Sequence, residues 1–353
     1  QVFPVFLLPL SVVLLALVMM MERINGAARW MTFMGVQFQP SEVAKMAVII
    51  VTAFILSKGQ DEDGASPKAF KRIMIITGVI CLLIAPENLS TAALLFGVVY
   101  LMMFIGRVAM KKLLILAGGL AGVAIIGVTF LVLTKNSDLP FLHRFDTWRA
   151  RIEKFTNDNE VPAAKFDIDK DAQIAHARIA VATSHVVGKG PGNSVQRDFL
   201  SQAFSDFIFA IIIEELGLIG GAFVVFLYVC LLIRVGRIAK KCERTFPAFL
   251  IIGIALLLVS QAIFNMMVAV GLAPVTGQPL PLISKGGTST LINCAYIGMI
   301  LSVSRYTARL EEQKEHDALI PMQVEVPAEE TNSDAQTAAE PTAKVLNSDA
   351  EFE

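Results

Sequence analysis

The chain carries few charged residues for its length. Only 17% of its 353 residues are Asp, Glu, Lys or Arg, whereas a soluble globular domain has about 25%. Its four histidines and four cysteines show no metal-ligand spacing and provide no disulfide framework. Neither a P-loop nor a dinucleotide-binding fingerprint occurs. These absences argue against nucleotide-binding enzymes and against a His/Cys metal site.

Long apolar runs dominate the sequence instead. Hydrophobic residues make up 55% of the chain, and the mean hydropathy is +0.62. A membrane-spanning helix needs about 20 mostly apolar residues. No internal repeat accompanies the runs, so an inverted-repeat transporter is not indicated. The sequence therefore predicts an all-α fold, a polytopic transmembrane helix bundle within residues 1–310, with eight spans at Phe3–Met20, Val43–Leu56, Ile73–Ile84, Thr91–Ile105, Leu113–Leu133, Phe207–Ile233, Phe246–Val270 and Thr288–Val303.

Lysine and arginine gather in every second connection between the runs. Short cytoplasmic loops are enriched in these residues, so the basic connections are predicted to be cytoplasmic. The other connections, 21–42, 85–90, 134–206 and 271–287, are then external. This topology predicts a multi-pass protein of the cytoplasmic (inner) membrane. The basic residues are Lys58, Lys68, Lys71, Arg72, Arg107, Lys111, Lys112, Arg234, Arg237, Lys240, Lys241, Arg244, Arg305 and Arg309.

Two segments outside the apolar runs differ in character. The external connection 134–206 carries charges of both signs, and its pattern predicts helices at roughly Arg144–Phe155 and Asp171–Val187, then a turn at Gly188–Gly192. The tail 311–353 is rich in Glu, Ala, Thr and Ser and buries too little apolar surface to fold. We therefore predict a disordered cytoplasmic tail.

Acidic residues at the sixth run need an explanation, because ionisable groups near a membrane are costly. Asp206 lies where the external connection enters this run. It is either a helix N-cap that accepts backbone N–H groups or a general base that takes a proton from a sugar hydroxyl. Glu214 and Glu215 follow inside the run. We expect both to pair with cations from a loop or a neighbouring helix. The run is also expected to kink near Gly217 or at the glycines that follow it.

Glu42 and Lys45 are one helical turn apart at the start of the second run. Their spacing permits a local ion pair. It equally permits a polar cavity wall in which Lys45 lies near an anionic phosphate. The residues alone do not favour either interpretation.

The stretch Gly271–Ser289 has three prolines and four glycines among apolar residues. Non-helical backbone at membrane depth must be buried by protein or line a wet cavity. The stretch is therefore a re-entrant structural turn, or a cavity wall whose Lys285 and backbone N–H groups face a phosphate.

Together these segments resemble the SEDS family (shape, elongation, division and sporulation), which includes the FtsW and RodA branches. The resemblance implies a ten-helix fold, so about two further N-terminal helices are expected. Asn88 stands where many members have aspartate, which puts an acid role there in doubt. Lys285 stands where many have tyrosine, and this feature and the long tail look more like FtsW. The matching segments are Asn25–Trp30, Phe38–Lys45, Leu89–Ala92, Gly188–Asn193, Asp206–Ala210, Glu214–Gly217 and Asn265–Ser289.

The resemblance also implies a function. It is the polymerisation of lipid II into peptidoglycan strands at the outer membrane face, in septal synthesis, by inverting transfer from a lipid-linked glycan strand. A lipid II flippase, a RodA-type elongation polymerase and a non-catalytic scaffold are the alternatives. The implied catalytic residue is Asp206. Substrate contacts are expected at Arg29, Glu42, Lys45, Ser284, Lys285, Gly286, Gly287 and Ser289.

The same resemblance implies partners. These are a class B penicillin-binding protein that acts as transpeptidase and other membrane proteins of the division machinery, with no nucleic acid. The leaving pyrophosphate needs positive charge, which a basic residue or a divalent cation (Mg²⁺ or Mn²⁺) would supply.

Overall fold

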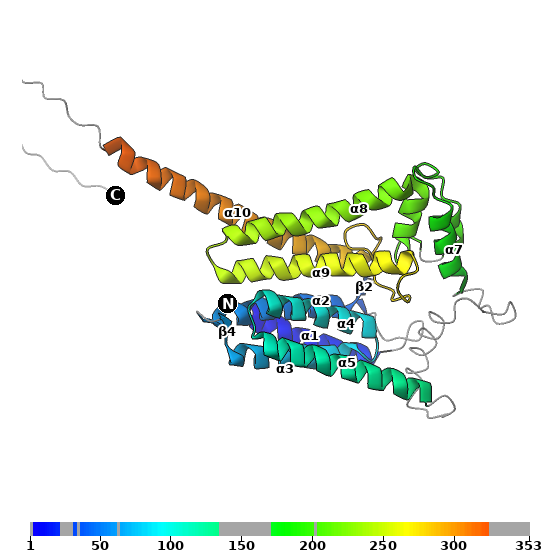
Figure 1. The fold of residues 1–353 in the computed structure, drawn as a ribbon, viewed down its shortest axis with the longest axis horizontal. Coiled ribbons are helices and arrows are strands. Elements are labelled where there is room, and N and C mark those ends of the chain that lie inside the picture. Colours follow the sequence, from blue (N-terminus) through cyan, green and yellow to red (C-terminus); the bar gives the residue numbers. More distant parts are fainter. Residues whose placement is uncertain are drawn as a thin grey trace, which may run out of the picture. The chain divides into compact units, whose positions relative to one another are not determined.

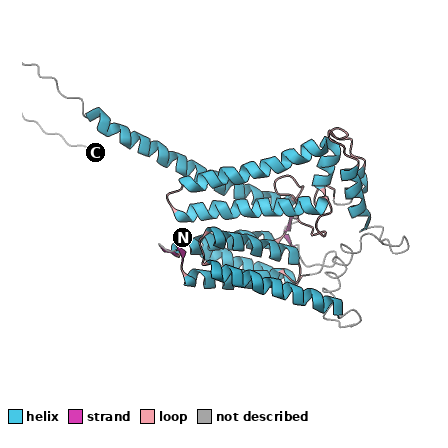
Figure 2. Ribbon diagram, in the orientation of Figure 1, coloured by secondary structure: helices cyan, strands magenta, loops and turns pink. Residues whose placement is uncertain are grey.

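The computed structural model of the chain describes residues 3–21, 31–33, 36–61, 64–133, 171–200 and 203–324. Within them a helix lies at each of the eight predicted positions (Figures 1 and 2). The helices are α1 (Phe3–Met19), α2 (Pro40–Lys58), α3 (Pro67–Ile84), α4 (Leu89–Ile105), α5 (Met110–Leu133), α7 (Asp171–Ala182), η3 (Gln196–Phe199), α8 (Ile208–Lys241), α9 (Thr245–Ala269) and α10 (Gly287–Val324). Two antiparallel hairpins pair β1 (Met31–Phe33) with β2 (Val36–Phe38) and β3 (Gln60–Asp61) with β4 (Gly64–Ala65).

Five of the described helices are long and apolar enough to cross a membrane. They are α2, α8, α9, residues Met110–Gly127 of α5 and residues Gly287–His316 of α10. α1 and α4 are apolar but shorter, while α3 begins with several basic residues. The outward faces of α5 and α8 present large apolar side chains, as a lipid environment requires. The chain is therefore an all-α, multi-pass membrane protein, which confirms the predicted fold class.

α9 is the helix on which the others pack. Apart from a few polar residues it is apolar all round, a pattern typical of a helix enclosed by neighbours. It contacts α2, α4 and α8, and Figure 1 shows it between α8 and the group α1–α5. Gly253 allows this close approach, because a Cβ there would lie 2.6 Å from Met102 Cε and 2.9 Å from Ile49 Cγ2. Small residues serve the same purpose at many membrane helix contacts.

The basic connections meet at one end of the bundle. Gln60 Nε2 donates to the Gly106 carbonyl at 2.9 Å, and Thr245 Oγ1 donates to the Ser57 carbonyl at 3.4 Å. These bonds join the loops after α2, α4 and α8, which we call the basic end. Because every second connection reaches this end, the alternation predicted from the basic residues is confirmed. The remaining described connections lie at the opposite end, which we call the Asp206 end (Figure 1).

α8 is interrupted near its start, as the glycines in the run predicted. The break is at Gly217, whose φ is 74° and ψ is −172°. In a continuous helix the N–H groups of Leu218 and Ile219 would donate to carbonyls four residues earlier. Here they donate to the carbonyls of His185 and Val186, each at 3.3 Å.

The break also leaves two carbonyls without helical partners, those of Glu214 and Glu215. They accept the N–H groups of Lys189 at 3.0 Å and Gly190 at 2.8 Å. The segment 185–190 thus satisfies all four main-chain groups that the break exposes. Unsatisfied, such groups would cost several kcal/mol each in a membrane, so the segment and the break depend on each other.

Gly188 is required at this contact, and its substitution gives a first prediction. Its φ is +78°, and an added Cβ would lie 2.4 Å from the Gly217 nitrogen. Gly192, at φ +81°, has open space instead, so it is a matched control. Gly192→Ala should lower the free energy of unfolding by only about 1–2 kcal/mol, the cost of the left-handed conformation for an alanine. Gly188→Ala should lower the melting temperature clearly more, and equal shifts in purified protein would contradict the contact.

α10 extends further than the sequence predicts. The helix continues past Glu311 to Val324, into the segment expected to be disordered. The residues from Ala308 to Glu315 are mostly strong helix formers. Extending an existing helix avoids the cost of nucleation, so these residues stay helical. The chain divides into two units, Gln1–Thr307 and Ala308–Glu353.

Candidate active site

Asp206 lies just before α8 and does not cap it. The helix begins at Ile208, its N-cap is Phe207, and no side chain caps it. The N-cap interpretation is therefore wrong. The Asp206 side chain is half-buried, and its Oδ1 accepts a hydrogen bond from Ser205 Oγ at 2.9 Å. Its backbone carbonyl accepts Asn265 Nδ2 at 2.8 Å, which ties this position to α9.

The loop between α9 and α10 lies against the residues that precede Asp206. Ser284 Oγ donates to the Ser205 carbonyl at 2.5 Å. The Lys285 N–H donates to the Phe204 carbonyl at 2.8 Å. The Lys285 side chain is exposed and makes no hydrogen bond or ion pair within the described residues. The structure therefore brings the backbone of Ser284 and Lys285 against the residues just before Asp206, and it leaves the Lys285 side chain exposed.

The backbone of this loop is held by polar side chains from within the bundle, as the interpretation as a re-entrant turn requires, while several of its side chains are exposed. Amide and phenol groups on α8 and α9 donate to its carbonyls, which satisfies acceptors that the irregular conformation exposes. The bonds run from Gln261 Nε2 to Pro279 at 3.1 Å, from Asn265 Nδ2 to Gln278 at 2.8 Å and from the Tyr228 hydroxyl to Pro281.

Glu42 and Lys45 form the predicted ion pair, but deep inside the protein. Lys45 Nζ lies 2.7 Å from Glu42 Oε1 and 3.2 Å from Gln261 Oε1, and the Lys45 side chain is 0% exposed. The ammonium is enclosed by protein groups, so in this conformation a phosphate cannot contact it. The geometry instead gives the pair the role of joining α2 to α9 and, through Gln261, to the re-entrant loop.

The acidic residues within α8 have different environments. Glu214 pairs with Lys189 at 2.6 Å, which confirms the expected partner from a loop. Glu215 makes no ion pair within the described residues, so the same expectation is not met there. No role was assigned from the sequence to Lys189, Gln261 or Asn265. The signal for the two amides was available, since polar residues four apart share one face of an otherwise apolar helix.

The other predicted residues fall at the margins of the site. Gly286 and Gly287 lead into α10, and Ser289 lies in its first turn. Asn88 caps α4, because its Oδ1 accepts the Thr91 N–H at 3.2 Å. An amide performs this structural role without any acid. Arg29 lies outside the described residues.

Known proteins resemble the chain over most of its length. The model of the FtsW, RodA and SpoVE family, described as cell cycle protein, matches residues 1–309. Probable peptidoglycan glycosyltransferase FtsW of Geobacter sp. (strain M18) is 34% identical over 282 residues, 79% of this chain and 72% of that protein. The protein of the same name from Enterococcus hirae is 30% identical and covers 80% of this chain and 69% of its own length.

Solved structures of known proteins also resemble the chain. One of them is a chain of a peptidoglycan synthase complex, which is described as the structural coordination of polymerization and crosslinking. It has a TM-score of 0.66 at 26% identity, and the match covers 86% of this chain and 81% of that one. The rod shape determining protein RodA of Thermus thermophilus shares the fold, with a TM-score of 0.57 at 24% identity over 85% of this chain and 76% of that one. The chain therefore belongs to the family of FtsW, RodA and SpoVE, the SEDS family, and is similar to its FtsW members.

Proposed function

We propose that Asp206 is the general base with which this chain, a peptidoglycan glycosyltransferase of the FtsW type, polymerises lipid II during septal synthesis. The carboxylate would take the proton of the acceptor sugar's 4-hydroxyl. That oxygen would attack the anomeric carbon of the lipid-linked strand, the configuration would invert, and undecaprenyl pyrophosphate would leave. A sugar hydroxyl is a weak nucleophile, and a positioned base contributes about 10²–10⁴-fold to the rate.

One observation carries this proposal. The Asp206 side chain is half-buried at the end of the bundle opposite the basic loops, and the Lys285 side chain is exposed. The hydrogen bond from Lys285 N to the Phe204 carbonyl, at 2.8 Å, fixes the two residues in neighbouring segments. A base and a cation at one site match the reaction, which removes a proton and releases a diphosphate.

A divalent cation fits this site only in a limited way. The described residues contain no group of three or more His, Cys, Asp or Glu side chains that could hold a metal ion. Mg²⁺ is commonly bound by one or two carboxylates together with substrate phosphates and water. In that mode Asp206 would hold the ion, which would help to neutralise the leaving pyrophosphate.

The arrangement favours a polymerase over a lipid II flippase. A flippase needs polar groups along a continuous path through the bundle. Asp206, Ser284 and Lys285 gather at one end, whereas the buried ion pair is enclosed by Gln261 and its neighbours. We propose that the Asp206 end faces outward, because the Lys- and Arg-rich loops occupy the other end.

A transpeptidase partner is part of the proposal. The related synthase complex is described as coordinating polymerization with crosslinking. We propose a class B penicillin-binding protein for this chain, in the company of other division proteins. The test is reconstitution of the chain and this partner in vesicles with lipid II. Glycan polymer of many disaccharide units is the expected product, and lipid II moved across the bilayer without polymer would contradict the proposal.

Lys285 gives a second prediction. Its exposed side chain makes no hydrogen bond or ion pair within the described residues, so Lys285→Ala should change the unfolding free energy by less than about 0.5 kcal/mol. A charge-assisted bond to a phosphate is worth about 1.5–3 kcal/mol, so kcat/KM for lipid II should fall about tenfold or more. Lys285→Arg keeps the charge and should retain most activity. Unchanged kcat/KM in the alanine variant would exclude the phosphate contact.

A further inference from the structure

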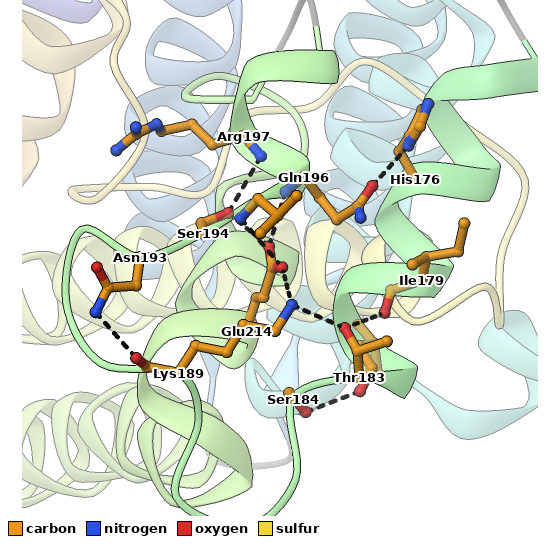
Figure 3. A network of polar contacts seen from close by, with 12 residues as sticks. His176, Ile179, Thr183, Ser184, Lys189, Asn193, Ser194, Gln196, Arg197 and Glu214 are labelled. Carbon is orange, nitrogen blue, oxygen red and sulfur yellow. Dashed lines mark hydrogen bonds and ion pairs between the residues drawn. The ribbon is translucent and has the colours of Figure 1, made fainter.

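A buried carboxylate with four donors lies between the break in α8 and the segment that precedes Asp206. Glu214 is 0% exposed, and its Oε1 accepts Lys189 Nζ at 2.6 Å and the Val195 N–H at 3.3 Å. Its Oε2 accepts Ser194 Oγ at 2.5 Å and the Gln196 N–H at 3.3 Å (Figure 3). We call these five residues the Glu214 cluster. Removing the carboxylate would leave several buried donors unpaired, which is costly.

The cluster connects three elements that are separate in the sequence. Lys189 also donates to Thr183 Oγ1, just after α7, at 3.3 Å. Gln196 of η3 bonds His176 of α7 at 2.6 Å, and Figure 3 shows this contact beside the cluster. The His176 ring also stacks on Phe199 at 5.2 Å between centroids. Through these contacts Glu214 of α8 connects α8 to α7, to η3 and to the loop between α7 and η3.

Asp206 is located between the two ends of this assembly. On one side η3 ends at Phe199, and Leu200 and Ala203 are buried in a core cluster with residues of α7, α8 and α9. On the other side lies the first part of α8, Ile208–Leu216, which ends at the break. No continuous helix fixes the direction of this part. The packing of this part on α9 and the bonds from the segment 185–199 fix it together, and the Glu214 carboxylate is the charged group that holds that segment.

We propose that Glu214 is a positioning residue for glycosyl transfer, which sets where Asp206 lies relative to Lys285. The inference rests on the proposed function of Asp206. Asp206 lies two residues before α8, and the helical part from Ile208 to Gly217 spans roughly 13 Å. A rotation of a few degrees at the break therefore displaces the carboxylate by about 1 Å, and a displacement of this size can lower a rate about 100-fold.

The test uses the full chain with its transpeptidase partner and lipid II. Glu214→Gln should lower kcat about 10- to 100-fold with little change in KM, because substrate contacts remain while the base is misplaced. Lys189→Met is a milder variant, since Lys189 is partly exposed, and it should lower kcat in the same manner. Lys189→Arg can still donate to Glu214 and should retain activity. Asp206→Asn is measured in parallel.

A second measurement tests whether Glu214 fixes the position of the segment around Asp206. Spin labels are placed at Phe204→Cys and Leu272→Cys, both exposed, in a chain without its native cysteines. Glu214→Gln should broaden the distance distribution between them. Wild-type kcat in Glu214→Gln while Asp206→Asn is inactive would overturn the inference, as would a lower kcat with unchanged label distances. Full activity of Asp206→Asn would instead refute the proposed function, and the label distances would still decide whether Glu214 positions this segment.

Discussion

Asp206→Asn should abolish most glycan polymerisation while leaving the protein folded. The amide has nearly the same shape and can still accept the hydrogen bond from Ser205 Oγ. It cannot take a proton from a sugar hydroxyl, so the initial rate should fall by about 10²–10⁴-fold. The measurement is the initial rate of polymer formation from labelled lipid II by the purified chain and its partner.

Two controls make this result specific. Asp61→Asn removes an exposed carboxylate at the basic end and should keep the wild-type rate, because it lies away from Asp206. The melting temperature of Asp206→Asn should stay close to that of the wild type, since its backbone bond to Asn265 is retained. A rate within a few-fold of the wild type would show that Asp206 is not the base.

Glu42→Gln should be among the most destabilising single substitutions in the bundle. Within the described residues, the substitution removes the only carboxylate that pairs with the fully buried Lys45 ammonium, at 2.7 Å. Breaking a buried ion pair by removing one partner costs about 3–5 kcal/mol, because the remaining charge is uncompensated. A large fall in melting temperature and in the yield of monodisperse protein is expected in detergent.

The double variant identifies the cause. Adding Lys45→Met removes the uncompensated charge at similar volume, so Glu42→Gln combined with Lys45→Met should regain most of the lost stability. Glu215→Gln is the matched control, because that carboxylate makes no ion pair within the described residues. It should change stability by less than about 0.5 kcal/mol. Equal stability of Glu42→Gln and the wild type would show that the ion pair is not structural.

The helices could be predicted because membrane spans are specified by local composition. A run such as Phe246–Val270 has one stable conformation in lipid, so the predicted and observed limits of α9 differ by one residue. The placement of the loops at two ends of the bundle could also be predicted, because Lys and Arg are concentrated in every second loop. The local signal was misleading at Glu311–Val324, where the polar composition predicted disorder. The segment is helical because it continues an existing helix and needs no new nucleation.

The contacts between distant segments could not be predicted in the same way. Lys189 and Glu214 are 25 residues apart, and nothing local indicates that the loop enters the break at Gly217. The burial of Lys45 could not be predicted either, because its spacing from Glu42 is the same in an exposed ion pair and in a buried one. The resemblance selected Asp206, and the structure added that it does not cap α8.

Restoring a negative charge at position 206 by chemistry tests the role of that carboxylate directly. Asp206→Cys is prepared in a chain whose four native cysteines are replaced by alanine. Iodoacetate then installs a carboxylate on the thiol, and iodoacetamide installs a neutral group of the same size. We expect the untreated and amide-bearing proteins to form almost no polymer and the carboxymethylated protein to regain measurable polymerisation. Equal polymerisation with both reagents, or wild-type activity before treatment, would contradict a catalytic carboxylate at this position.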